Sequence, residues 1–232
     1  MADATPALAR GVRWLVRTRV TLAFCLLLCS VYAVELYLWT TGQFDAFDTL
    51  FVARQRPSVG WLLAPLAHSP VQHTHLLGNL AQLLVFGAIA ERRLRDEAYL
   101  GLIAASGVAS IGAQVTTYVV AGDPPGVGTL GASGIAFALT ALVVVDSLRY
   151  QEITDRWHGE TTWFFTLFGG LLSGQALLEV VFGVPGVGVV GHFVGVVVGA
   201  SFALVRSRTE VLRSGGVTGS RGPQRPDRRR RS

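Results

Sequence analysis

The chain has 232 residues, of which 50% are hydrophobic and 15% charged, and its formal net charge is +5 at pH 7. The mean hydropathy is +0.45. This composition is too apolar for an ordinary soluble domain. Since the apolar residues occur in blocks, the sequence predicts a polytopic membrane protein.

Six apolar blocks follow one another along the chain, and each predicts a helix. They cover residues 21–40, 76–90, 99–121, 130–146, 162–182 and 187–205. A helix rises ~1.5 Å per residue, so about 20 residues cross a hydrocarbon core of ~30 Å. The second and fourth blocks are short for a full crossing, which predicts that they begin below the surface or are covered by protein. We therefore expect an all-α membrane domain of six transmembrane helices over residues 21–206.

The segments outside the blocks complete the predicted domain organisation. Residues 1–20 are rich in arginine and lack a cleavage site, so we expect a cytoplasmic N-terminal segment before a retained first span. Residues 41–74 are too polar and too interrupted by proline to span, which predicts an outer loop lying partly on the membrane interface. Residues 207–232 are rich in Gly, Ser and Arg, which predicts a disordered cytoplasmic tail.

The distribution of arginine predicts the orientation of the chain. Arginines cluster before the first block, after the second, after the fourth and at the C-terminus, whereas the alternate loops contain few. By the positive-inside rule, both termini are cytoplasmic in a multi-pass protein of the cell membrane. The leading ends of the second, fourth and sixth blocks then open on the outer side.

Ser133 lies in the sequence Gly131-Ala132-Ser133-Gly134, at the leading end of the fourth block. The glycines let the backbone turn sharply and let other groups approach closely. A serine in the first turn of a helix lies near free N–H groups and the positive end of the helix dipole, which favour developing negative charge. Taken alone, the tetrapeptide is equally typical of packing residues in membrane helices.

His192 lies at the leading end of the sixth block, on a face of small residues. These residues are Gly191, Gly195 and Gly199. Such a face permits close helix contact, so we expect it to pack on the fourth helix at Gly134 and Ala138. His192 would then lie beside Ser133 and could act as the base for a serine nucleophile, with Phe137 packed beneath the imidazole. The alternative is a histidine bonded to a backbone carbonyl for packing alone.

His75 and Asn79 add a third candidate element at the head of the second block. They are four residues apart, hence on one helix face, and both can donate a hydrogen bond to an oxyanion. The alternative roles are helix capping or a buried amide contact. A metal site formed by His68, His73 and His75 is disfavoured, because no carboxylate or HExxH pattern accompanies them. We expect no metal ion or other cofactor.

These motifs together resemble the rhomboid family of intramembrane serine proteases, over about residues 60–206. The motifs are His75-x-x-x-Asn79, Gly131-x-Ser133-Gly134, His192-x-x-Gly195-x-x-x-Gly199 and Gly87-x-x-x-Glu91. The resemblance implies a Ser133–His192 dyad without an acidic third member, and an oxyanion site made by His75, Asn79 and the Ser133 N–H. It also implies transmembrane protein substrates, cleaved within the lipid bilayer near its outer face. Nucleic acid is not expected as a partner, because the chain has no folded basic domain.

Two other classes of function remain open. A catalytically silent rhomboid-like protein would bind transmembrane helices without cleaving them, but loss of the serine or histidine would mark such a protein, and both are present. A small-solute carrier would require repeated halves with broken helices, and the sequence has no internal repeat.

Overall fold

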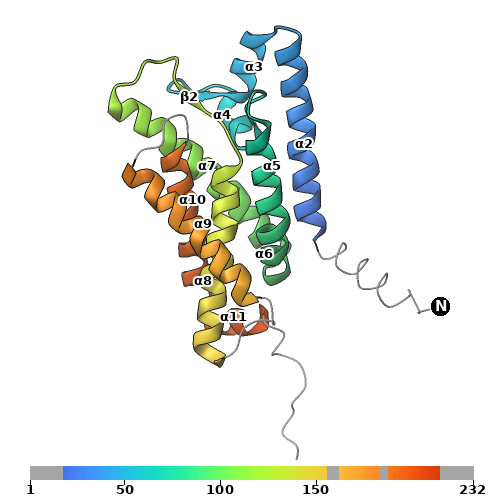
Figure 1. The fold of residues 1–232 in the computed structure, drawn as a ribbon, viewed down its shortest axis with the longest axis vertical. Coiled ribbons are helices and arrows are strands. Elements are labelled where there is room, and N and C mark those ends of the chain that lie inside the picture. The colour runs from blue at the N-terminus through green and yellow to red at the C-terminus, as the bar shows by residue number, and fades with distance from the viewer. Residues whose placement is uncertain (1–17, 156–161, 183–187, 215–232) are drawn as a thin grey trace, which may run out of the picture.

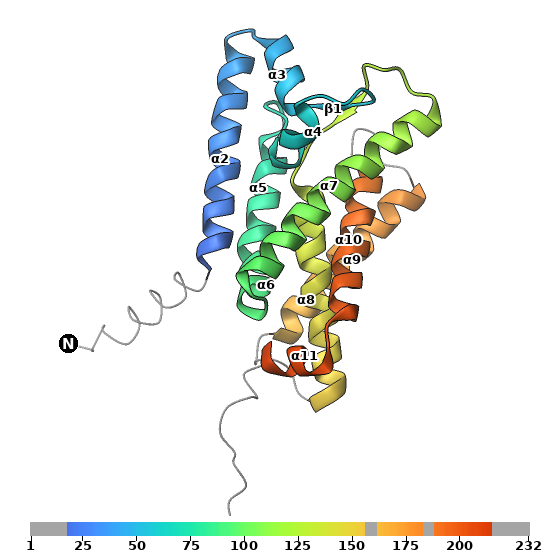
Figure 2. The same cartoon turned by 180° about the vertical axis from the view of Figure 1, so that it is seen from behind.

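The computed structural model describes residues 18–155, 162–182 and 188–214, and this part of the chain is mostly helical (Figures 1 and 2). The α-helices are α2 (Arg19–Thr40), α3 (Phe44–Phe51), α4 (Gly60–Leu63), α5 (His73–Gln82), α6 (Ala88–Arg93), α7 (Asp96–Ala121), α8 (Ser133–Thr154), α9 (Thr162–Phe182), α10 (Val189–Val205) and α11 (Arg208–Ser214). A 3-10 turn η1 (Ala64–Leu66) and a π-helical turn η2 (Leu83–Gly87) interrupt them, and the strands are β1 (Ala53–Arg54) and β2 (Gly128–Thr129). Because α5, η2 and α6 run on as one segment, six long helical segments match the six apolar blocks. The predicted helical, polytopic fold is confirmed.

The second and fourth helical segments are longer than predicted: α5, η2 and α6 together cover residues 73–93, and α8 covers Ser133–Thr154. Among the described residues, α2, α7, α8 and α9 are long and apolar enough to cross a bilayer, whereas α10 has 17 residues and spans ~25 Å. The fourth segment is therefore not short: α8 begins at Ser133 and runs eight residues past Asp146. The reason is that the polar residues at the predicted end and just beyond it are buried, among them Asp146, Ser147 and Tyr150. Composition alone marked them as the end of a span.

Helix α8 is the centre of the bundle. Within its most apolar window 72% of the residues are buried by protein, against 28% for α2 and 17% for α9. In Figures 1 and 2, α8 lies among α5–α6, α7, α9 and α10, with α2 on the far side of α5. Helix α9 presents a row of large apolar side chains to its surroundings, including Phe164, Leu171 and Phe182. A lipid-covered periphery and a protein-covered centre follow from this difference.

Helices α8 and α10 are in contact backbone to backbone. A methyl group added at Gly195 would overlap the carbonyl oxygen of Gly134, and one added at Gly199 would overlap that of Ala138. A methyl group added at Gly191 would lie 3.3 Å from the carbonyl oxygen of Ser110 on α7, which is crowded but not an overlap. Only hydrogen at Gly195 and Gly199 allows α8 and α10 to approach so closely.

Glu91 fastens the beginning of α2 to α6. Its carboxylate accepts hydrogen bonds from the backbone N–H groups of Val20 (2.9 Å) and Thr21 (2.8 Å), and from the Thr21 hydroxyl (2.6 Å). The Tyr99 hydroxyl lies 2.9 Å from the same threonine oxygen. These are free N–H groups of the first helical turn, which a carboxylate satisfies well. A methyl group added at Gly87 would crowd the Thr21 and Tyr99 side chains, which accounts for a glycine one turn before Glu91.

A buried ion-pair cluster closes the bundle at the end where α6, α8 and α10 terminate. Arg206 donates to Asp146 at 2.5 Å, and Arg93 lies 3.5 Å from the other carboxylate oxygen. The side chain of Asp146 is fully buried, and its charge is compensated by these arginines, with Arg206 the closer of the two.

The predicted disorder of residues 207–232 is wrong for the first part of this segment. Helix α11 occupies Arg208–Ser214, and the remaining residues of the segment lie outside the described part of the chain. The reason is a capping box: Glu210 accepts from the Ser207 backbone N–H at 2.8 Å, and the Ser207 hydroxyl accepts from the Glu210 N–H at 3.3 Å. Most of the predicted N-terminal segment 1–20 also lies outside the described residues.

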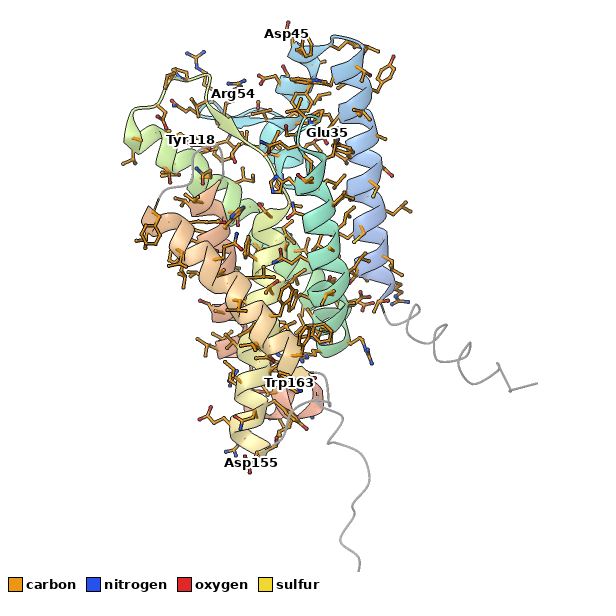
Figure 3. All side chains as sticks on the ribbon, viewed as in Figure 1. Glu35, Asp45, Arg54, Tyr118, Asp155 and Trp163 are labelled. Atoms are coloured by element: carbon orange, nitrogen blue, oxygen red, sulfur yellow. The ribbon has the colours of Figure 1, made fainter. Side chains whose placement is uncertain are left out.

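The predicted outer loop, residues 41–74, is a folded layer at one end of the bundle. Helix α3 buries Phe47 and Phe51 against Leu38 of α2, and β1 pairs antiparallel with β2. Figure 3 shows Asp45, Arg54 and Tyr118 at this end, whereas Asp155 and Trp163 lie at the opposite end. Helix α5 already begins at His73, three residues before the predicted start of the second block.

We expect the contact between α8 and α10 to be intolerant of a single added methyl group. Gly199→Ala should lower the free energy of unfolding by about 2 kcal/mol, because the helices must separate to admit it. Gly170→Ala on α9 is the control, since no neighbouring atom lies within 4 Å of the added carbon. It should be neutral or slightly stabilising. Thermal unfolding of the purified protein in detergent measures both, and equal stability of the Gly199 variant and the wild type would contradict the prediction.

Candidate active site

Ser133 is the first residue of α8 and lies below the end of the bundle rather than at it. Figure 1 shows the chain after β2 descending from the layer formed by residues 41–74 to the start of α8. Gly131 makes this turn with φ +138, a conformation that residues with a side chain rarely adopt, and its N–H donates to the Ala64 carbonyl at 2.8 Å. Ser133 is 8% exposed. Its hydroxyl is thus held at the N-terminus of a central helix, where free N–H groups are available.

His192 lies in the first turn of α10, and Gln114 of α7 anchors this turn. The Gln114 side-chain oxygen accepts from the backbone N–H groups of Val190 and Gly191, both at 3.1 Å. The His192 N–H itself donates to the Gly188 carbonyl at 3.1 Å. A side chain from a neighbouring helix thereby satisfies the free donors of a helix end that has no capping side chain of its own.

The side chains of Ser133 and His192 meet across the contact between α8 and α10. The Ser133 Oγ lies 2.9 Å from the His192 Nε2, within hydrogen-bond range. The ring of Phe137, one turn further along α8, lies against the imidazole with centroids 4.7 Å apart. The structure therefore brings together the three side chains that the sequence had assigned to α8 and α10.

The other ring nitrogen of His192 has a partner that the sequence analysis missed. The Nδ1 lies 2.8 Å from the Oε2 of Glu179, near the end of α9. The Gln175 side chain, one turn earlier, donates to the Oε1 of Glu179 at 2.9 Å. A signal was available, because Glu179 is the one acidic residue in the predicted span 162–182. An ionisable residue inside a span is itself evidence for a functional contact.

His75 and Asn79 occupy different positions relative to the serine. His75 lines the same cavity as Ser133, and its ring approaches Gly131, immediately before the start of α8. Asn79 is 4% exposed, and its Nδ2 lies 2.9 Å from the His68 Nε2. An amide nitrogen carries two hydrogens, so this contact leaves one of them free. The pair is thus present on one face of α5, with only His75 directly on the cavity wall.

His68 is held by its own buried contacts. Its backbone N–H donates to both carboxylate oxygens of Glu35, at 2.9 and 3.1 Å. Glu35 is labelled in Figure 3, in the upper half of α2. Burial lowers the pKa of His68 to about 4, so its ring is neutral near pH 7 and its Nε2 can accept from Asn79. His68 therefore orients the Asn79 amide.

The three histidines considered for a metal site have different hydrogen-bonding surroundings, although the rings of His68 and His75 pack edge to face. His68 contacts Asn79, His73 contacts the Tyr32 hydroxyl through Nδ1, and His75 faces the cavity. Within the described residues no group of three or more metal-ligating side chains is gathered.

A cavity of about 650 Å³ surrounds the serine and histidine, with walls from α5, α7, α8 and α10 and from the segments around β2. Its polar lining includes Ser69, Gln72, Thr74, Gln114, Tyr118 and Thr129. Such a lining suits water, in contrast to the apolar outer faces of the helices. The cavity is large enough for a short extended peptide segment together with water, which is the space that an acyl-transfer reaction requires.

Comparison with known proteins identifies the family of the chain. A model of the rhomboid domain matches residues 57–209, which include α5 to α10 and every site residue described above. No curated protein matches the chain significantly. Because the matched domain covers well over half of the sequence and the helical membrane fold accompanies it, the chain belongs to the rhomboid family.

Proposed function

We propose that the protein is an intramembrane serine endopeptidase that cleaves transmembrane substrates near the outer face of the cell membrane. The rhomboid family acts on transmembrane substrates and includes both serine proteases and inactive members. The observation that favours an active member is the 2.9 Å contact between Ser133 Oγ and His192 Nε2 on the wall of a cavity lined by polar as well as apolar groups. A helix-binding protein without catalysis would not need this contact.

In the proposed reaction, the Ser133 oxygen attacks the peptide carbonyl while its proton passes to the His192 Nε2. The developing oxyanion is stabilised by the Ser133 N–H at the start of α8, together with His75 and Asn79. His192 returns the proton to the departing amine, and an acyl-enzyme on Ser133 remains. Water from the cavity then hydrolyses this ester with His192 again acting as base.

The proposed orientation places both termini on the cytoplasmic side. Helices α6, α8 and α10 all end in the lower half of Figure 1, and α2 begins there. The arginines that follow these helices include Arg93, Arg95, Arg206 and Arg208, whereas the opposite end has Arg54 and Arg56. The positive-inside rule then directs the cavity to the outer side. The proposed membrane domain comprises residues 21–206, with its outer layer at about 41–74.

Replacement of the nucleophile tests the proposal. Ser133→Ala should abolish cleavage of a model transmembrane substrate by purified protein in detergent, and should abolish labelling by a fluorophosphonate probe. Ser106→Ala is the control, because the Ser106 hydroxyl is buried and donates only within its own helix, to the Leu102 and Ile103 carbonyls. Cleavage by the Ser133 variant at the wild-type rate would refute the proposal. Absence of Ser133-dependent labelling in the wild type would instead favour a catalytically silent helix-binding protein.

Removal of an oxyanion donor should reduce the rate without abolishing it. Asn79→Ala should lower kcat by roughly 10²–10³-fold, the usual effect of one such donor. Gln82→Ala is a matched control on the same helix segment, because its amide donates to the Thr140 hydroxyl of α8 (2.8 Å) and has no assigned role towards the oxyanion. It should leave kcat within a few-fold of wild type. Thermal unfolding of both variants separates a loss of rate from a loss of folded protein, and an unchanged kcat for Asn79→Ala would remove this residue from the site.

A further inference from the structure

The two nitrogens of the His192 ring have different partners, and these partners determine where the ring proton lies. The Nε2 faces Ser133 Oγ at 2.9 Å, and the Nδ1 faces Glu179 Oε2 at 2.8 Å. A neutral imidazole carries one N–H and one free acceptor nitrogen. To accept the serine proton, the ring must have its N–H on Nδ1, which is the nitrogen directed at a carboxylate.

Glu179 is itself held in place. Its Oε1 accepts from the Gln175 side chain at 2.9 Å, which leaves Oε2 directed at the histidine. The side chains of His192 and Glu179 are 9% and 12% exposed, so little water separates or screens them. An ionised carboxylate can only accept hydrogen bonds, so it selects the tautomer with the proton on Nδ1.

A role in helix packing alone explains the contact between Glu179 and His192 less fully. The pair joins α9 to α10, and a charged side chain near the end of an apolar helix needs some partner. For packing alone, Glu179 could pair with any nearby polar residue. It would not need to contact Nδ1, the ring nitrogen that faces away from Ser133. The contact is instead the arrangement in which an acidic residue orients a histidine base.

We propose that Glu179 is a positioning residue for His192, giving the site a third member beyond the serine and histidine. This inference rests on the proposed protease function. As the Ser133 oxygen forms its bond to the substrate carbon, the proton passes to Nε2 and the ring becomes positively charged. The Glu179 Oε2 accepts the Nδ1–H and stabilises this imidazolium. The proton then leaves on the amine as the peptide C–N bond breaks, and the neutral ring is restored.

The test compares Glu179→Gln and Glu179→Asp with wild type in detergent. Glu152→Gln is the matched control, because Glu152 is an exposed carboxylate on α8. For each variant, kcat and KM are measured with a model transmembrane substrate, together with the rate of fluorophosphonate labelling at Ser133 and the unfolding temperature. Glu179→Gln should lower kcat and the labelling rate by roughly 10²-fold or more, with KM within about 3-fold of wild type.

The two Glu179 variants separate charge from shape. Gln has the shape of Glu without its charge, whereas Asp keeps the charge on a shorter chain. A positioning carboxylate predicts more activity for Glu179→Asp than for Glu179→Gln, at an unchanged unfolding temperature. Equal or greater activity of the Gln variant would overturn the inference, as would a loss of activity matched by a loss of folded protein. If the wild type shows no Ser133-dependent labelling, the proposed function fails and this inference fails with it. If the wild type is labelled and the Glu179→Gln variant is labelled at the same rate, the inference alone fails.

Discussion

The close approach of α8 and α10 is the contact on which the rest of the site depends. A serine hydroxyl and an imidazole can meet at 2.9 Å across two membrane helices only if the helix backbones almost touch. Gly195 and Gly199 allow this, because any side chain there would overlap a carbonyl of α8. Helix association in lipid depends on packing rather than on a hydrophobic driving force, so a smooth face both stabilises the pair and sets its spacing.

Polar groups inside this bundle form small networks that also fix the helices in depth. Glu91 holds the start of α2, Asp146 joins α6 to the chain after α10, and Glu35 holds the segment before α5 through His68. An unsatisfied polar group costs several kcal/mol where water is absent, so each network specifies one relative position of its helices. The cavity lies among elements that these contacts constrain.

Within the site, too, polar contacts fix the positions of the residues. Gln114 satisfies the free N–H groups of α10 and so positions the turn that holds His192. His68 orients Asn79 on one side of the site, and Glu179 contacts His192 on the other. Each side chain proposed to act on the substrate has a neighbour that restricts its orientation, which is what preorganised catalysis requires.

The sequence by itself was sufficient for the fold class and for the pairing of Ser133 with His192. Apolar blocks of span length, small residues repeated every four positions and polar residues at block ends are all local patterns, and they predict which faces meet. The helical membrane fold was confirmed, and the predicted serine and histidine lie together.

Only the tertiary structure decided the length of α8, the folded form of residues 41–74, the helix α11 and the second partner of His192. The length of α8 and the helix α11 depend on burial or capping of polar residues such as Asp146 and Glu210, which hydropathy cannot distinguish from exposed ones. The folded form of residues 41–74 depends on the packing of Phe47 and Phe51 against α2. The contact with Glu179 depends on the rotation and depth of α9 relative to α10, and that is set by packing among helices distant in sequence. A glutamate in an apolar block indicates that a partner exists, but only the packed bundle identifies the partner as the nitrogen opposite the serine.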